Sequence, residues 1–157
     1  MTPRMTSQTG IPILYTPLSP SQILHVGRLE ELEKAIEREL PLVDLKVEHY
    51  FAPHVYLRKM YIPKGVVATG KIHLTGHLSI VSKGVLNLVD SEGSRILPEG
   101  THFYSEPGEK RAVYALQDSI LTTVHPTDTT DLKELERELV VPTVQAYQQL
   151  QFIKELE

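Results

Sequence analysis

Residues 70–84 read GKIHLTGHLSIVSKG, a run in which polar and apolar residues alternate between glycines. Successive side chains of an extended strand point to opposite faces. The alternation therefore predicts that four polar side chains share one strand face: Lys71, His73, Thr75 and His77. Buried polar groups need hydrogen-bonding partners, which a plain apolar core does not offer. We therefore predict that this face lines a pocket.

The sequence around this run indicates an antiparallel β-structure. Between residues 42 and 126, about eight to ten short β-rich segments are separated by turns that contain Gly or Pro. No helical pattern lies between these segments, whereas parallel strands need a crossover connection that is usually a helix. The pattern thus predicts a mainly β fold, an antiparallel sandwich or small barrel.

Helical patterns flank the β-rich region. Residues 28–40 carry apolar side chains at helical spacing and are followed by Pro41. Near the C-terminus, Asp131 is suited to cap a helix, and a second, shorter helix is predicted over residues 144–153. The predicted organisation is an extended N-terminal arm (1–21), an N-terminal helix (22–41), a β-barrel (42–126) and a C-terminal helical segment (127–157).

The composition excludes several classes of protein. The 157 residues include no Cys, which excludes disulfides, thiolate metal ligands and a Cys nucleophile. The formal net charge is −4 with no dense Lys/Arg stripe, so a nucleic-acid partner is not expected. The sequence has neither a signal-peptide pattern nor an apolar run of about 18 residues. We therefore expect a soluble, cytoplasmic protein without a membrane partner.

Two further polar patches complete the predicted pocket, around residues 107–111 and 122–125. Arg111 is a permanently charged donor that fits a carboxylate or phosphate. The predicted ligand-binding residues are Lys71, Thr75, Lys110, Arg111, Tyr114 and Thr123. The pocket histidines are expected to gain charge as the pH falls through about 6.5. These groups predict a small anionic ligand such as a phosphate, a carboxylate or a nucleotide.

The remaining histidines have no companion pattern, which predicts surface or loop positions for them: His25, His49, His54 and His102.

The spacing around Gly84 resembles the first motif of the cupin superfamily, a group of small β-barrels. With six residues between it and Gly84, His77 stands at the position of the motif's Glu. His73 stands at the position of its second His, and Lys71 replaces the first.

The second cupin motif is present in a shortened form. Gly100 begins it, Pro107 and Gly108 give its turn, and Arg111 replaces its ligand His. The resemblance implies a double-stranded β-helix, or jelly-roll barrel. It also implies a divalent transition metal (Zn, Fe, Ni or Mn), for which the candidate ligands are His73, His77 and His125.

From about Leu29 to Leu139 the chain resembles, in particular, the cupin-like proteins of tailed bacteriophages. The matching residues are Tyr61 to Gly65, Gly70, Lys71, His73, His77, Pro107, Gly108, Lys110, Arg111, Tyr114, Ala115, Thr123 and His125. This resemblance implies a phage source and thus the cytoplasm of the host cell. Small cupins commonly pair, and residues 11–15 offer an additional strand to a neighbour, so we expect a homo-oligomer, a dimer or higher.

Three classes of function remain open on the sequence. The first is a pocket that binds a small anion, a transition metal or both. The second is an enzyme with candidate catalytic residues His73, His77 and His125, either a metal-dependent oxygenase or isomerase, or a phosphodiesterase. Such a protein could also sequester or cleave a nucleotide signal of host defence. The third is a virion or assembly scaffold.

The phosphodiesterase alternative depends on two short motifs, His73-Leu74-Thr75 and His125-Pro126-Thr127. In two-histidine phosphoesterases, paired His-x-Thr motifs supply a general acid, a general base and two hydroxyls for the phosphate.

Overall fold

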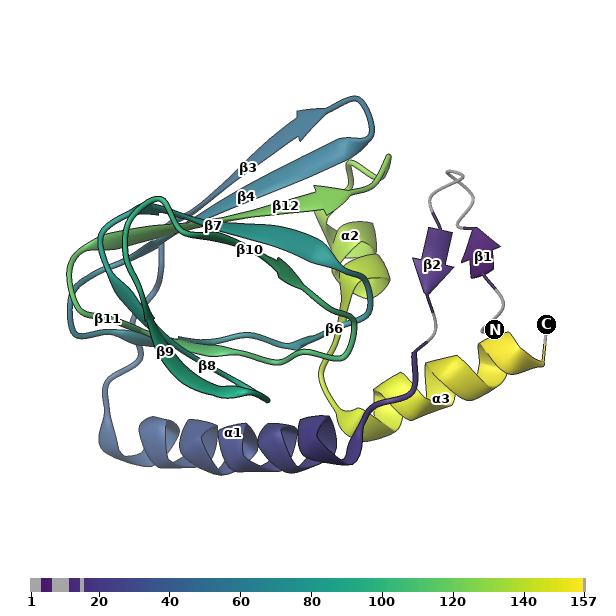
Figure 1. The fold of residues 1–157 in the computed structure, drawn as a ribbon, viewed down its shortest axis with the longest axis horizontal. Helices are drawn as coiled ribbons and strands as arrows, with labels where there is room; N and C mark the ends of the chain where they lie inside the picture. The colour runs from purple at the N-terminus through teal and green to yellow at the C-terminus, as the bar shows by residue number, and fades with distance from the viewer. Residues whose placement is uncertain (1–3, 7–11, 15, 157) are drawn as a thin grey trace.

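Two antiparallel β-sheets that face each other form the centre of the molecule (Figure 1). The structure, a computed structural model, describes residues 4–6, 12–14 and 16–156. The first sheet consists of β3 (Val47–Ala52), β4 (Val55–Ile62), β7 (His77–Lys83), β10 (His102–Ser105) and β12 (Ser119–Pro126). The second consists of β5 (Val67–Thr69), β8 (Leu86–Asp90), β9 (Gly93–Leu97) and β11 (Ala112–Ala115).

The order of the strands is that of an eight-stranded jelly roll. The first sheet has the order β10-β7-β12-β4-β3 and the second β5-β11-β8-β9, so the chain passes repeatedly from one sheet to the other. Strand β3 adds an outer strand beside β4. The predicted mainly β, jelly-roll barrel is therefore confirmed.

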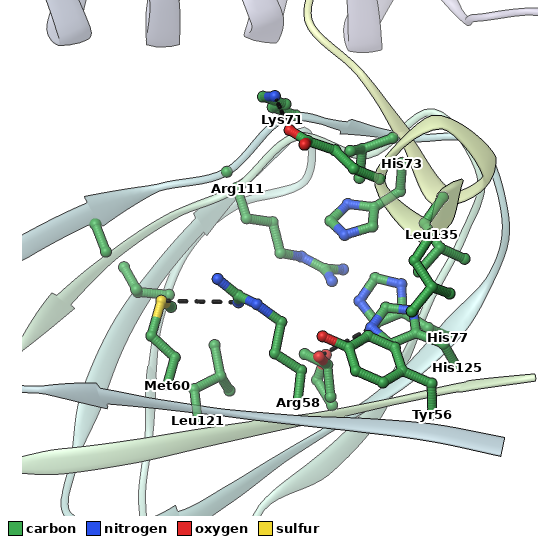
Figure 2. Close-up of a pocket in the computed structure, with 18 of the residues that line it drawn as sticks. Tyr56, Arg58, Met60, Lys71, His73, His77, Arg111, Leu121, His125 and Leu135 are labelled. Atoms are coloured by element: carbon green, nitrogen blue, oxygen red, sulfur yellow. Dashed lines mark hydrogen bonds and ion pairs between the residues drawn. The ribbon is translucent and has the colours of Figure 1, made fainter. Parts of the chain in front are cut away.

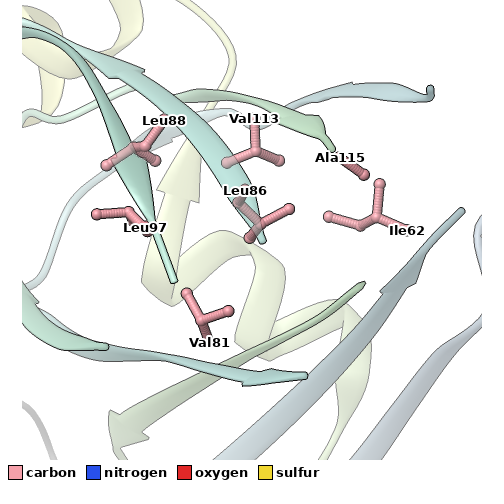
Figure 3. Packing of buried hydrophobic residues seen from close by; sticks show 7 residues of the cluster. All are labelled: Ile62, Val81, Leu86, Leu88, Leu97, Val113 and Ala115. Carbon is pink, nitrogen blue, oxygen red and sulfur yellow. The ribbon is translucent and has the colours of Figure 1, made fainter. Parts of the chain in front are cut away.

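An apolar core fills one end of the barrel, as Figure 3 shows. It consists of Ile62, Val81, Leu86, Leu88, Leu97, Val113 and Ala115. On β8 the buried side chains alternate with less buried ones, as expected for a strand with one face turned inward. Strand β4 begins at the opposite end, where Tyr56 pairs in register with His125 of β12.

Helix α1 (Pro20–Glu39) runs beside the four-stranded sheet (Figure 1). It begins two residues before the predicted helical segment 22–41, because Ser19 and Gln22 form a capping box and Pro20 occupies the first turn. The helix buries Val26 against a small second core, and His25 is buried too. The His25 ring donates from Nε2 to the main-chain oxygen of Lys110 at 2.6 Å, so the predicted surface position of His25 is wrong.

The C-terminal segment closes the open end of the barrel. Helix α2 (Leu132–Leu139) is capped by Asp131, as predicted, because the Asp131 carboxylate accepts from the main-chain nitrogens of Lys133 and Glu134. Strand β13 (Val140–Val141) then pairs with β6 (Ile72–His73), and α3 (Val144–Glu155) follows. Figure 1 shows α2 at the mouth of the barrel.

A short hairpin precedes α1. Strand β1 (Arg4–Thr6) pairs with β2 (Pro12–Leu14) in an antiparallel register. Figure 1 shows this hairpin apart from the barrel, near the end of α3. Of the segment predicted to dock on a neighbour, residues 11 and 15 lie outside the described residues. Within the described part of the chain, no helix is both long and apolar enough to cross a membrane.

Candidate functional site

A cavity of about 580 Å³ lies at the α2 end of the barrel (Figure 2). Side chains from both sheets and from α2 line it. It occupies the end of the barrel that the apolar core leaves unfilled, and Leu88 and Val113 belong to both the core and the cavity wall.

The register between β4 and β12 arranges the cavity wall in layers. Tyr56 is opposite His125, Arg58 is opposite Thr123, and Met60 is opposite Leu121. All six side chains line the cavity, because every second residue of a strand points to the same face. The wall therefore changes from aromatic to charged to apolar along the barrel axis.

We name three layers by their residues. The imidazole layer consists of Tyr56, His73, His77 and His125. The arginine layer consists of Arg58, Ser79, Arg111 and Thr123. The floor consists of Met60, Leu88, Val113 and Leu121.

Three histidines lie ring against ring in the imidazole layer. The ring centroids are 4.3 Å apart between His73 and His77, 4.6 Å between His77 and His125, and 6.3 Å between His73 and His125. His73 and His77 belong to the run at residues 70–84, and His125 lies near the end of β12. The structure thus brings together all three predicted pocket histidines.

Burial keeps these imidazoles uncharged. It is the largest cause that lowers their pKa values, to about 4 for His73, about 2 for His77 and about 3 for His125. Neighbouring imidazoles and the guanidinium of Arg111 or Arg58 lower them further. The expectation that these rings gain charge near pH 6.5 is therefore corrected: at neutral pH they act as hydrogen-bonding groups.

Of the six ring nitrogens of the three histidines, two have hydrogen-bonding partners, and two others are buried without one. Nδ1 of His73 donates to the main-chain oxygen of Glu109 at 3.2 Å, and Nε2 of His125 is hydrogen-bonded to the Thr123 hydroxyl at 2.9 Å. Nδ1 of His77 and Nδ1 of His125 are buried and have no hydrogen-bonding partner among the described residues. Such atoms are costly to bury alone, so they are available to a ligand.

Arg111 lies in the arginine layer with its charge partly balanced. Its guanidinium donates to the Ser105 hydroxyl, and its Nε lies 3.8 Å from a carboxylate oxygen of Asp90. That same carboxylate is shared with Arg95, at 3.1 Å. Burial lowers the pKa of Arg111, and the nearby Glu109 and Asp90 oppose this effect.

Arg58 is a cavity residue that the sequence analysis missed. Its Nη1 donates to the Met60 sulfur at 3.8 Å, a weak acceptor. Among the described residues, no carboxylate oxygen lies within 4 Å of its side-chain nitrogens. Figure 2 shows the guanidinium groups of Arg58 and Arg111 in the middle of the cavity. The signal was present in the alternation Tyr56, Arg58, Met60 along one predicted strand.

His49 was also missed as a cavity residue. It is exposed, as predicted, but it also lines the cavity, and its Nδ1 is hydrogen-bonded to the Tyr56 hydroxyl at 2.6 Å. This hydrogen bond holds the Tyr56 ring in place within the imidazole layer. His54 and His102 are exposed, as expected.

Lys71, His73, Thr75 and His77 do not share one strand face. Only Ile72 and His73 form strand β6, and the chain bends before β7 begins at His77. Lys71 is exposed at the cavity mouth, where it pairs with Glu136 of α2. Thr75 does not line the cavity.

Two other predicted ligand-binding residues point elsewhere. Lys110 is buried against α1, where its Nζ lies 2.5 Å from a carboxylate oxygen of Glu33. Tyr114 is exposed on the outside of the barrel and is not part of the cavity wall. Of the predicted ligand-binding residues, Arg111 and Thr123 thus lie inside the cavity.

The phosphodiesterase motifs are not assembled. Neither Thr75 nor Thr127 lines the cavity, and the Thr127 hydroxyl donates to the Glu138 carboxylate. The two hydroxyls that would hold a phosphate are therefore not beside the two imidazoles, and this alternative is corrected.

A metal ion is the cofactor that the resemblance implies at the three histidines. In the described part of the chain, no three His, Asp or Glu side chains are arranged to hold a metal ion. Arg58 and Arg111 also place positive charge beside the imidazoles, which disfavours a divalent cation. In this arrangement the donors do not fit a metal ion.

Comparisons with known proteins gave likeness at the level of structure. No family model matches the chain, and the search of curated proteins found no match. KdgF from Halomonas sp. is 17% identical with a TM-score of 0.46, over 57% of this chain and 87% of that one. An RmlC-like cupin from Shewanella frigidimarina is 19% identical with a TM-score of 0.46, over 54% and 78% of the two chains.

A cupin domain of an XRE family transcriptional regulator from Enterobacter cloacae is 12% identical with a TM-score of 0.47, over 53% and 97% of the two chains. Because these TM-scores lie below 0.5, the fold assignment rests on the chain's own strand order. That order, with helices flanking the two sheets, gives the chain a mainly β, antiparallel jelly-roll barrel.

Proposed function

We propose that the barrel cavity binds a small organic anion, with Arg58 and Arg111 as its charge-bearing contacts. The observation that carries the proposal is the position of Arg58, whose guanidinium faces the cavity and whose hydrogen-bonding partner among the described residues is the Met60 thioether. A charge held in a partly enclosed site without a counter-charge is costly, and a bound anion removes that cost.

The surrounding groups suit an anionic head. The guanidinium of Arg is planar and donates two parallel hydrogen bonds to a carboxylate or a phosphate. Above the arginine layer, the neutral imidazoles and the Tyr56 hydroxyl add polar groups without adding charge. Specificity for an anion would thus come from the arginines, and its orientation from the imidazole layer.

The test is thermal melting and calorimetric titration with phosphate, citrate, acetate and cyclic or linear nucleotides. We expect at least one organic anion to raise the melting temperature of the wild-type protein by mass action. The Arg58→Gln variant should lose this shift. The matched control is Lys59→Gln, because Lys59 is the next residue along β4 but does not line the cavity.

If no anion shifts the melting temperature of the wild-type protein, the proposal is wrong and a scaffold function is favoured. The metal ion that the resemblance implies is the alternative outcome of this test, although the donors as they are arranged in the described residues do not fit one. Stoichiometric metal after chelator-free purification, lost in both His73→Ala and His77→Ala, would favour a metal site. It would require the imidazoles to rearrange from the positions described here.

A nucleotide of host defence remains a narrower proposal for the ligand of this cavity. A phage source remains a proposal for the origin of the chain. The nucleotide arm of the titration tests the first of these.

A further inference from the structure

We infer that the anion is amphiphilic, with one negatively charged head at Arg58 and Arg111 and an apolar body of several carbons against the floor. This inference rests on the proposed function and names the class of its ligand.

The size of the cavity argues against a simple inorganic anion. A phosphate ion displaces about as much volume as two or three water molecules of ~30 Å³ each. The cavity measures about 580 Å³, so such an ion would leave most of it to be filled by water. Water beside an apolar wall is unfavourable, and a ligand that replaces it gains affinity.

The cavity wall changes from charged to apolar between the arginine layer and the floor. From the arginine layer toward the core, the next side chains along β4 and β12 are Met60 and Leu121. Leu88 and Val113, which are register partners, complete the floor from the other sheet. No floor side chain carries a nitrogen or an oxygen atom, and the apolar core lies directly behind them.

This floor disfavours a ligand that is polar along its whole length. A sugar acid seated at the arginines would bring hydroxyl groups against Met60 and Leu121, where the only hydrogen-bonding atom of the floor is the Met60 sulfur, a weak acceptor already paired with Arg58. An alkyl or aryl body makes only apolar contacts there. The floor therefore selects for apolar chemistry at the end of the ligand remote from the charge.

The charges indicate a single negative head. Arg111 already faces Asp90 and Glu109, whereas Arg58 has no acidic partner within 4 Å among the described residues. One uncompensated positive charge therefore remains for the ligand. A monocarboxylate matches this balance better than a dianion.

The experiment is a calorimetric titration of the wild-type protein with straight-chain carboxylates from acetate to decanoate, below their micelle concentrations. Each buried methylene should tighten binding about fourfold, equivalent to about 0.8 kcal/mol, until the floor is filled. Glucuronate serves as the polar comparison. Alkylamines of the same lengths serve as the comparison of opposite charge and should not bind.

Variants of Leu121 locate the apolar body. Leu121→Phe reduces the space at the floor and should shorten the chain length that binds best. Leu121→Ala enlarges it and should lengthen that optimum, which keeps the test decisive if the Phe variant does not fold. Leu132→Phe is the matched control: Leu132 lines the cavity from α2 at its mouth, so the optimum should not move.

The outcomes separate this inference from the proposed function. Carboxylates that bind through Arg58 with no dependence on chain length would overturn the inference and leave the proposed function standing. Glucuronate binding more tightly than hexanoate would do the same. A chain-length dependence that survives in Arg58→Gln would overturn the charged head, and absence of all anion binding would overturn both.

Discussion

Lys71 and Glu136 form an ion pair at the mouth of the cavity, between the residue that precedes β6 and helix α2. Both side chains are about half exposed, at 49% and 59%. Lys71 is thus held outside the layers that line the cavity interior.

The first prediction concerns this ion pair. Exposed pairs contribute little, so Lys71→Met should change the free energy of unfolding by less than about 1 kcal/mol. Anion affinity should change by less than about threefold, because solvent and salt screen a charge at the mouth. Denaturant titration and calorimetry measure the two effects. Loss of binding in Lys71→Met, equal to that in Arg58→Gln, would place the ammonium at the ligand.

The second prediction concerns acid stability. The imidazoles of His73, His77 and His125 ordinarily titrate near 6.5, and burial lowers their pKa values to about 4, 2 and 3 in the folded chain. Below pH 6.5 the unfolded chain therefore binds protons that the folded chain does not bind. The contribution of these imidazoles to the free energy of unfolding is fully present above pH 6.5 and is lost as the pH falls.

Denaturant titrations between pH 7 and pH 4 should show a loss on the order of several kcal/mol. Replacing one proton-binding ring, as in His77→Phe, should reduce the slope of stability against pH. A free energy of unfolding that stays constant from pH 7 to pH 5 would contradict the buried, neutral imidazole layer.

The third prediction concerns Gly84, which has a φ of +82°. A Cβ at this position would also contact the main chain of Asp118 and lie 2.9 Å from the Cα of Ser119. The matched control is Gly100, whose φ of +87° is similar but whose Cβ would meet no atom within 4 Å.

Gly100→Ala should cost about 1–2 kcal/mol from the backbone conformation alone. Gly84→Ala should cost clearly more, because the turn must also move away from the main chain of residues 118 and 119. Equal losses of melting temperature in the two variants would show that the close approach at Gly84 is relieved at no cost.

The fourth prediction concerns the ion pair that joins α1 to the barrel. Lys110 is 4% exposed and its Nζ lies 2.5 Å from a carboxylate oxygen of Glu33. Glu33→Gln leaves this ammonium without a counter-charge and should destabilise the fold by about 1–3 kcal/mol, a range reduced because Glu33 is a third exposed. Glu37→Gln, on an exposed position of the same helix, should have almost no effect.

The fifth prediction is self-association. We expect light scattering at micromolar concentration to give the mass of a dimer or a larger oligomer. A mass near 17.7 kDa, that of one chain, would contradict it.

The sequence predicted the barrel well because the patterns that indicate its strands and turns involve residues close together in the sequence. Turn residues separate the strands, and the alternation along residues 86–90 reappears as the buried face of β8. The cap at Asp131 was also predicted, since a capping box lies within four residues. Helix α1 starts two residues before the predicted boundary at residue 22, because Pro20 was interpreted as part of the arm, although Pro is favoured in the first turn of a helix.

The site was predicted less completely, because a strand face is defined only as far as the strand continues. The bend before His77 ends the alternation that placed Lys71 and Thr75 beside His73. Arg58 was missed because its position in the cavity depends on which strand pairs with β4. That pairing joins residues far apart in the sequence, here Arg58 and Thr123.

The register of β4 against β12 also has a consequence for misfolding. A slip of one residue in β4 would turn Arg58 out of the barrel and bring Leu57 and Lys59 inward. In the slip that sets Lys59 opposite Leu121, its ammonium would lie at the floor beside the apolar core, where it has no partner, so this pairing is penalised more heavily than lost contacts alone would require. The charged residues of β4 thus disfavour this misaligned pairing with β12.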